Sequence, residues 1–215
     1  MRQTFASLLL FALWLCALHG AEPITPAAQK VIAAIESMEV EKYWLAGAIV
    51  DWQTGLPTGK PVTDAGKHTH CSQFVAAACA KLGVYILRPP EHSAVLLANA
   101  QFDWLGSDSG KKAGWSPSVS GSTAQDDANK GSLVVAVYKN SDEKKSGHIA
   151  IVRPGERAAD QIAIDGPEVQ RWPDAWRERP PADLHPEVVN ALCAGWSSWL
   201  KVLKPLQQAG AVCDN

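Results

Sequence analysis

The chain has 215 residues, of which 47% are hydrophobic and 20% are charged, and this composition excludes a disordered chain, a collagen-like repeat and a coiled coil. Lys and Arg total 20 and Asp and Glu total 22, which gives a net charge of −2, so the chain lacks the basic surface that binds nucleic acid. The five cysteines are too few for a disulfide-dense scaffold. The length suits a single domain with a sizeable core.

Residues 1–21 have the pattern of a secretory signal peptide. Arg2 is the only charge before an apolar run at 8–18, and small residues follow that run. The run is short for a membrane span, although an uncleaved anchor is the alternative. No later stretch of the sequence is long and apolar enough to cross a bilayer. We therefore expect residues 22–215 to be exported to the periplasm or the medium, without stable membrane insertion.

The spacing of apolar residues predicts helices in the first half of the chain. They are expected at 27–45, at 71–82 and at 93–105. Glycine and proline punctuate residues 51–69, which are expected to form a loop. Residues 106–131 are rich in Gly, Ser, Asp and Lys and are expected to form a long surface loop.

Short apolar segments bounded by turn residues predict strands in the second half. They are expected at 132–138, 148–152 and 161–164, and a closing helix is expected at 187–203. Helices followed by consecutive short strands predict an α+β fold, with the helices packed on a small antiparallel sheet. No repeat and no shift in composition marks a second domain.

Cys71 stands at the start of the helix expected at 71–82. Helical spacing places it on the same face as Phe74, Val75 and Ala78, so its thiol points toward whatever that helix packs on. The partial positive charge of a helix N-terminus lowers a thiol pKa, and the unpaired N–H groups of the first turn can hold an oxyanion. The alternative is a small buried residue or half of a disulfide.

The other cysteines bear on that choice, because export exposes thiols to an oxidising compartment. Four cysteines remain after the signal peptide and allow three pairings. Cys71 and Cys79 are eight residues apart on one expected helix, about 12 Å along its axis, and cannot bridge each other. A bond between Cys193 and Cys213 would clip the C-terminal tail and leave the other two thiols free.

His148 opens the strand expected at 148–152. Strand alternation places it on one face with Ala150 and Val152, and small Ala150 leaves room for an approaching helix end. A histidine held at a strand end beside a packed helix can act as a general base, whereas the alternative is a half-exposed surface histidine. Together Cys71 and His148 form a candidate thiol–imidazole couple.

Residues 71–75 (CSQFV) and 147–152 (GHIAIV) resemble the NlpC-type and CHAP-type cysteine peptidases, compact members of the papain-like superfamily. The matching stretch runs from about 67 to 167. The resemblance implies a papain-like fold, with a single catalytic domain at 22–215 and a catalytic core at about 67–170. It also implies an endopeptidase or amidase that needs no cofactor or metal and cleaves amide bonds in peptidoglycan stem peptides. Peptidoglycan or its peptide fragments would be the partner, in agreement with the export signal.

In this family a polar residue on the strand after the histidine strand orients the imidazole. Asp165 is the first candidate here because it ends the strand expected at 161–164, and Gln170 is held in reserve. Asp165 also opens an Asp-Gly-Pro sequence, which is an ordinary turn signal. Ser72 and His70 flank the nucleophile and are candidates for the oxyanion site or the mouth of the cleft.

The same region allows a zinc-dependent hydrolase as a rival. His68, His70 and Cys71 lie within four residues, and His92 could add a fourth ligand. The spacing matches no recurrent zinc pattern, and no acidic helper stands among these residues.

A third possibility is a cell-wall or sugar-binding module without chemistry, because the chain is rich in tryptophan. The residues concerned are Trp104, Trp115, Trp172, Trp176, Trp196 and Trp199. Trp196 and Trp199 are three residues apart on an apolar expected helix, a spacing that favours packing in the core.

Overall fold

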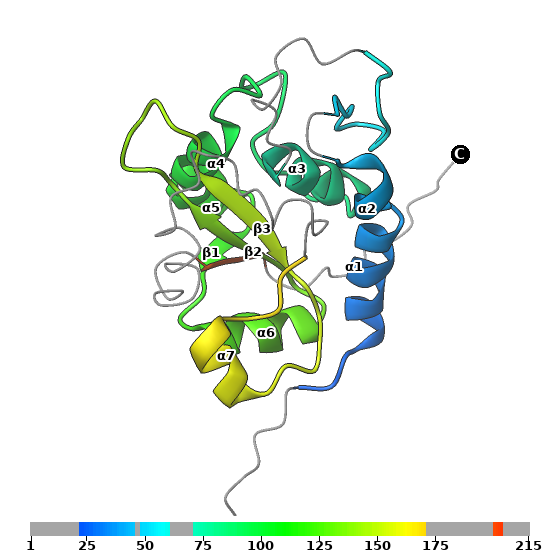
Figure 1. The fold of residues 1–215 in the computed structure, drawn as a ribbon. Helices are drawn as coiled ribbons and strands as arrows, with labels where there is room; N and C mark the ends of the chain where they lie inside the picture. The colour runs from blue at the N-terminus through cyan, green and yellow to red at the C-terminus, as the bar shows by residue number, and fades with distance from the viewer. Residues whose placement is uncertain (1–21, 46–47, 61–70, 171–199, 204–215) are drawn as a thin grey trace, which may run out of the picture.

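The structure is a computed structural model, in which residues 22–45, 48–60, 71–170 and 200–203 are described (Figure 1). Several of the sequence expectations fall outside these residues, namely those on 1–21, His68, His70, Cys193, Cys213 and the four tryptophans from Trp172 to Trp199. Among the described helices, none has the length and the apolar character that crossing a membrane requires.

Helices and strands are mixed along the chain. In order they are α1 (Pro26–Glu36), α2 (Val40–Tyr43), α3 (Cys71–Lys81), α4 (Leu97–Gly106), α5 (Asp108–Lys112), β1 (Trp115–Pro117), α6 (Gly121–Asn129), β2 (Leu133–Tyr138), β3 (His148–Val152), α7 (Ala159–Asp165) and β4 (Leu200–Leu203). Within the described residues the strands form one sheet in the order β1-β4-β2-β3, and every pair is antiparallel. The expected α+β class, with helices on an antiparallel sheet, is therefore confirmed.

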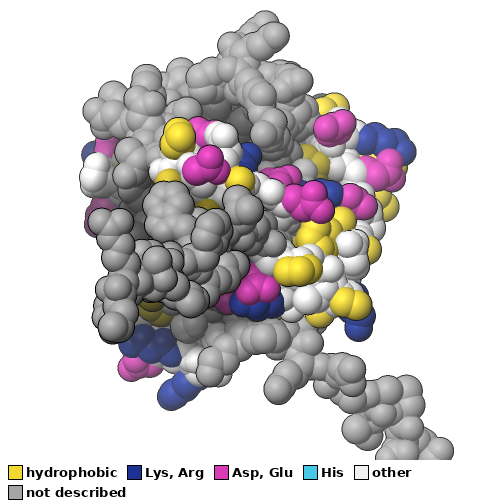
Figure 2. All heavy atoms as spheres, turned by 90° about the horizontal axis from the view of Figure 1, so that it is seen from below, with side chains coloured by type: hydrophobic (Ala, Val, Ile, Leu, Met, Phe, Trp, Pro, Cys, Tyr) yellow, Lys and Arg dark blue, Asp and Glu magenta, His cyan; other side chains and the backbone are white. Residues whose placement is uncertain are grey.

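The two faces of the sheet bury different groups of side chains. Val135, Ile149 and Ile151 pack with residues of α1, α3 and α4 in the main core, whereas Val134 and Val152 pack with residues of α6 in a smaller one. In Figure 1, α6 and α7 accordingly lie on the other side of β2 and β3 from α3. Seen from the α6–α7 side, the described surface carries acidic, basic and apolar side chains interspersed (Figure 2).

The expected helix at 71–82 is confirmed almost residue for residue. It is α3, and it is followed by Gly83, whose φ of +69° is a left-handed conformation that glycine adopts without strain. Trp44 lies fully buried beside it, and its ring meets the Phe74 ring edge-on with centroids 5.2 Å apart. Such an aromatic pair contributes about 1 kcal/mol beyond its buried area. The helix that carries Cys71 is thus fixed by the main core.

The helices expected at 27–45 and 93–105 differ from the observed ones in their boundaries. The first is divided into α1 and α2, because Glu39 takes a left-handed conformation with φ of 41° that a continuous helix cannot contain. The second begins at Leu97, after Leu96 takes a similar conformation with φ of 55°. Neither break is marked by glycine or proline in the sequence.

The long surface loop expected at 106–131 is wrong, because this stretch contains α5, β1 and α6. Helix α6 (GSTAQDDAN) has few apolar residues, and its buried side includes Gln125 and Asn129. The Ser120 hydroxyl accepts a hydrogen bond from the Thr123 N–H at 3.0 Å and caps the helix. The side-chain amide of Asn129 donates a hydrogen bond from Nδ2 to the Gly155 carbonyl and accepts one at Oδ1 from the Gly155 N–H. Hydrogen bonds therefore hold this helix in place together with the packing of Ala124 and Ala128 in the smaller core.

Two further expectations near the end of the chain are wrong. Residues 161–164 belong to helix α7 rather than to a strand. Residues 200–203, expected at the end of a helix, form strand β4 between β1 and β2. The rest of the helix expected at 187–203 lies outside the described residues.

Candidate active site

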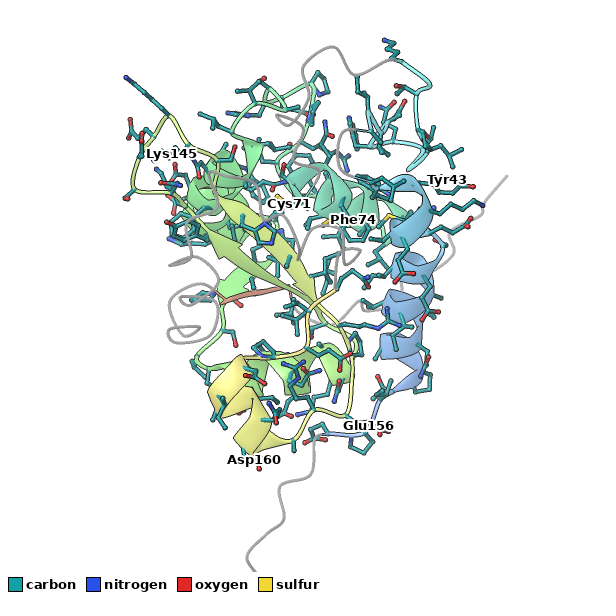
Figure 3. The ribbon with its side chains drawn as sticks, viewed as in Figure 1. Tyr43, Cys71, Phe74, Lys145, Glu156 and Asp160 are labelled. Atoms are coloured by element: carbon teal, nitrogen blue, oxygen red, sulfur yellow. The ribbon has the colours of Figure 1, made fainter. Side chains whose placement is uncertain are left out.

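Cys71 begins α3, and its side chain is 5% exposed. It belongs to the same core cluster as Phe74 and Val75, as helical spacing predicts. Figure 3 shows Cys71 at the end of α3 that lies next to β3. The backbone N–H of Ser72, in the first helical turn, donates a hydrogen bond to the sulfur. The start of the helix therefore presents an amide donor to the thiol.

The outer edge of β3 supplies a second amide donor. Near the far end of the strand, the Arg153 N–H donates to the Glu168 carbonyl and the Ile151 carbonyl accepts from the Gln170 N–H, both away from β2. Backbone groups in a strand alternate in direction, so the N–H of Ile149 also points away from β2. This N–H donates a hydrogen bond to the Cys71 sulfur. Cys71 thus lies at the edge of the sheet.

That edge position explains how Cys71 reaches His148. His148 is the first residue of β3 and pairs with Tyr138, and its side chain is half-buried. Alternation places it on the opposite face of the strand from Ile149, which packs with α3. Helix α3 packs on the face of the sheet opposite to the His148 side chain. A sulfur atom beside the edge of the strand can nevertheless contact the imidazole, because the edge is accessible from both faces. Each side chain shifts the pKa of the other through its charge and a hydrogen bond, which indicates that the two side chains lie together.

The two side chains shift each other's pKa in opposite directions. Burial by itself would raise the pKa of the Cys71 thiol, but the charge and hydrogen bond of His148, with the amides of Ile149 and Ser72, outweigh it and lower that pKa. Burial would lower the pKa of His148, and the charge and hydrogen bond of Cys71 raise it instead. Both shifts favour a thiolate–imidazolium pair, the reactive form of a nucleophilic cysteine.

The structure does not bring either candidate for the third residue to His148. Asp165 ends α7, far from α3 in Figure 1, and its exposed carboxylate accepts a hydrogen bond from Gln161 of the same helix. Gln170 accepts from Arg153 Nη1 at 3.1 Å, just past the end of β3 opposite His148. Five residues of extended strand span about 16 Å. The expected positions of Asp165 and Gln170 beside the imidazole are therefore wrong.

The remaining candidates around Cys71 are only partly described. Ser72 is buried, and its carbonyl accepts a hydrogen bond from Gln101 Nε2 at 3.2 Å. His92 is half-buried, and its Nδ1 lies 2.7 Å from the Ser93 carbonyl oxygen. Within the part of the chain that is described, no group of three or more His, Cys, Asp or Glu residues could hold a metal. His68 and His70, the other proposed zinc ligands, lie outside that part.

The two described tryptophans from the sugar-binding hypothesis occupy different environments. Trp115 is buried, and its Nε1 donates a hydrogen bond to the Tyr85 carbonyl at 2.9 Å. Trp104 is half-buried, and its ring meets the Tyr85 ring with centroids 5.3 Å apart. Trp115 is therefore a core residue rather than a platform for a sugar ring.

Sequence reasoning missed two polar side chains that the structure places close to the couple. Asn99 and Gln101, both buried on α4, contact the loop before His148 and the turn after Cys71 respectively. Polar residues at buried helix positions are a signal, but the buried face of α4 is known only once its packing is known. The Ile149 amide has no signal in the sequence, because every residue except proline carries one.

Models of known protein families give no match to this chain, and no curated protein is similar to it.

Proposed function

We propose that this chain is an exported cysteine hydrolase of the papain-like type, which cleaves amide bonds in peptidoglycan stem peptides. The observation that carries the proposal is the Cys71–His148 couple, in which the thiol pKa is lowered although the thiol is buried. An inert buried cysteine has its pKa raised instead. A cysteine-bearing helix packed on an antiparallel sheet that carries the histidine also suits a papain-like arrangement.

The couple can perform amide hydrolysis in two steps. In the first, the Cys71 thiolate attacks the carbonyl carbon, the C–N bond breaks, and the His148 imidazolium gives its proton to the leaving nitrogen. This forms a thioester. In the second, the neutral imidazole takes a proton from water while the oxygen attacks the thioester. The C–S bond breaks, a carboxylic acid leaves, and the thiolate–imidazolium pair is restored.

The substrate class rests on the resemblance of residues 71–75 and 147–152 to cell-wall peptidases and on the signal-like start of the chain. A peptidoglycan substrate lies outside the cytoplasmic membrane, so the enzyme must be exported to reach it. Localisation in the periplasm or outside the cell is therefore part of the same proposal.

The test is to incubate the purified protein with peptidoglycan and to identify the released fragments by mass. Cys71→Ala is expected to release none, and Cys79→Ala, a matched change on the same helix, is expected to release the same fragments as the wild type. Excess EDTA is expected to leave the activity intact, whereas a thiol alkylator abolishes it. Fragments released by Cys71→Ala, or loss of activity together with a stoichiometric metal, would contradict the proposal.

A further inference from the structure

Helix α4 contributes two buried polar side chains. One bonds to the loop between β2 and β3, and the other bonds to the first turn of α3. Asn99 is 7% exposed and Gln101 is fully buried. Two residues apart on a helix, they point in roughly opposite directions. In the structure α4 contacts α3, β2 and β3 (Figure 1). The helix therefore lies where it can touch both elements that carry the couple.

Asn99 holds the loop that delivers His148. Its Nδ2 donates to the Lys145 carbonyl at 2.9 Å, and its Oδ1 accepts from the Asn140 N–H at 3.1 Å. These two residues lie on the two sides of the loop between β2 and β3, and Figure 3 labels Lys145 in that loop. One side chain thus closes the loop just before β3 begins at His148.

Gly147 allows this approach. A Cβ atom on Gly147 would lie 2.4 Å from Asn99 Oδ1 and 2.1 Å from the Tyr138 carbonyl oxygen. Both distances are far shorter than a non-bonded contact between carbon and oxygen. The residue immediately before His148 is therefore pressed against the Asn99 side chain. A displacement of Asn99 is passed directly to the backbone of His148.

Gln101 holds the other half of the couple. Its Nε2 donates to the Ser72 carbonyl at 3.2 Å and to the Leu87 carbonyl at 3.0 Å. Its Oε1 is buried and has no hydrogen-bond partner among the described residues. An unsatisfied buried acceptor destabilises the fold, and an apolar side chain of the same size would avoid it. What the glutamine contributes at this position is therefore the pair of hydrogen bonds that its Nε2 donates.

We propose that Asn99 and Gln101 are positioning residues, through which α4 sets the separation between Cys71 and His148. Gln101 fixes the first turn of α3, Asn99 fixes the start of β3, and one helix carries both. Because the couple is held by backbone contacts at its two ends, small movements of α4 separate the thiol from the imidazole. This inference rests on the Cys71–His148 couple of the proposed function, but not on its substrate.

The test measures the rate at which iodoacetamide alkylates Cys71 as a function of pH, with each cysteine followed separately by peptide mass. For Asn99→Ala, the pH midpoint of alkylation is expected to rise by about one unit, and the rate at pH 6.5 to fall about tenfold. Gln101→Met is expected to shift the midpoint in the same direction. Asn99→Ser, whose hydroxyl cannot reach both loop groups, carries the same prediction should the alanine variant fail to fold.

Asp103→Asn is the matched control. Asp103 lies one turn beyond Asn99 on α4, and its Oδ2 accepts from Lys139 Nζ at 2.7 Å, but this ion pair is exposed. Its loss is expected to leave the alkylation profile within twofold of wild type, because exposed pairs contribute little.

Three results can be told apart. A low midpoint in the wild type that rises in the Asn99 and Gln101 variants supports the inference. A low midpoint in the wild type that none of these variants moves, even where they lower the melting temperature, assigns both residues a structural role and overturns the inference alone. An ordinary midpoint in the wild type overturns the couple, and with it both the proposed function and this inference.

Discussion

The two ends of α3 carry the same side chain in opposite electrostatic settings. Cys71 and Cys79 are both buried, and both are free thiols, while their spacing on one helix excludes a bond between them. At Cys79, burial raises the thiol pKa to about 12, and the charge of Arg88 opposes it too weakly to matter. At Cys71 the pKa is lowered despite the same burial. The difference in thiol pKa therefore comes from the groups next to each sulfur, which at Cys71 are His148 and the backbone amides, and not from burial, which the two thiols share.

The largest expected effect comes from removing the His148 imidazole, which lowers the thiol pKa of Cys71 and has no counterpart at Cys79. In His148→Ala, burial of Cys71 is no longer opposed by a neighbouring charge, so its pKa rises above the ordinary value. Alkylation of Cys71 at pH 6.5 is expected to fall at least about 100-fold, because each pKa unit removes about tenfold of the thiolate. Labelling of Cys79 in the same sample is the internal control. Unchanged labelling of Cys71 would refute the couple.

The pH dependence of hydrolysis sharpens the same comparison. The Cys71 thiolate is lost when the pH falls below its lowered pKa, and the His148 imidazolium is lost when the pH rises above its raised pKa. Activity is expected between these limits and should fall about tenfold per pH unit beyond each. A profile of kcat/KM measures both limits, and Cys79→Ala should reproduce it. Activity that keeps rising through the alkaline range would argue against a protonated His148 as the acid.

A smaller loss is expected from Gly147→Ala. The added methyl group cannot fit between Tyr138 and Asn99, so the loop must move away from α4 and carry His148 with it. Hydrolysis is expected to fall about tenfold, since small misplacements of catalytic groups have large effects on rate. Gly106→Ala is the matched control, because a Cβ there meets nothing within 4 Å. Equal activity of the two variants would show that the loop tolerates the methyl group.

The smallest effect is expected at the sequence-based candidate for the third residue. Asp165 is exposed at the end of α7, so Asp165→Ala should change the rate of hydrolysis less than about twofold, as for most surface substitutions. The measurement compares kcat/KM of this variant with that of wild type on one substrate. A loss of tenfold or more would return Asp165 to a catalytic role that the observed geometry does not give it.

The helix that begins at Cys71 and the strand that begins at His148 could be predicted because their signals are local. Helical spacing after Cys71 and the apolar run after His148 each lie within a few residues, and both elements form as expected. Helix α6 could not be predicted in the same way, because its buried side includes amides that are satisfied by distant backbone groups. Residues 161–164 are a short apolar segment, for which periodicity alone does not separate helix from strand.

The sequence by itself determined which residues start the key helix and strand, and that Cys71 and Cys79 cannot bridge. Only the tertiary structure decided that the Cys71 sulfur lies at the edge of β3 away from β2, near the amides of Ser72 and Ile149 and beside His148. The physical reason is range. Helix and strand patterns are written in neighbouring residues, whereas the pKa of a buried thiol depends on charges and N–H groups that the fold brings from 77 residues away.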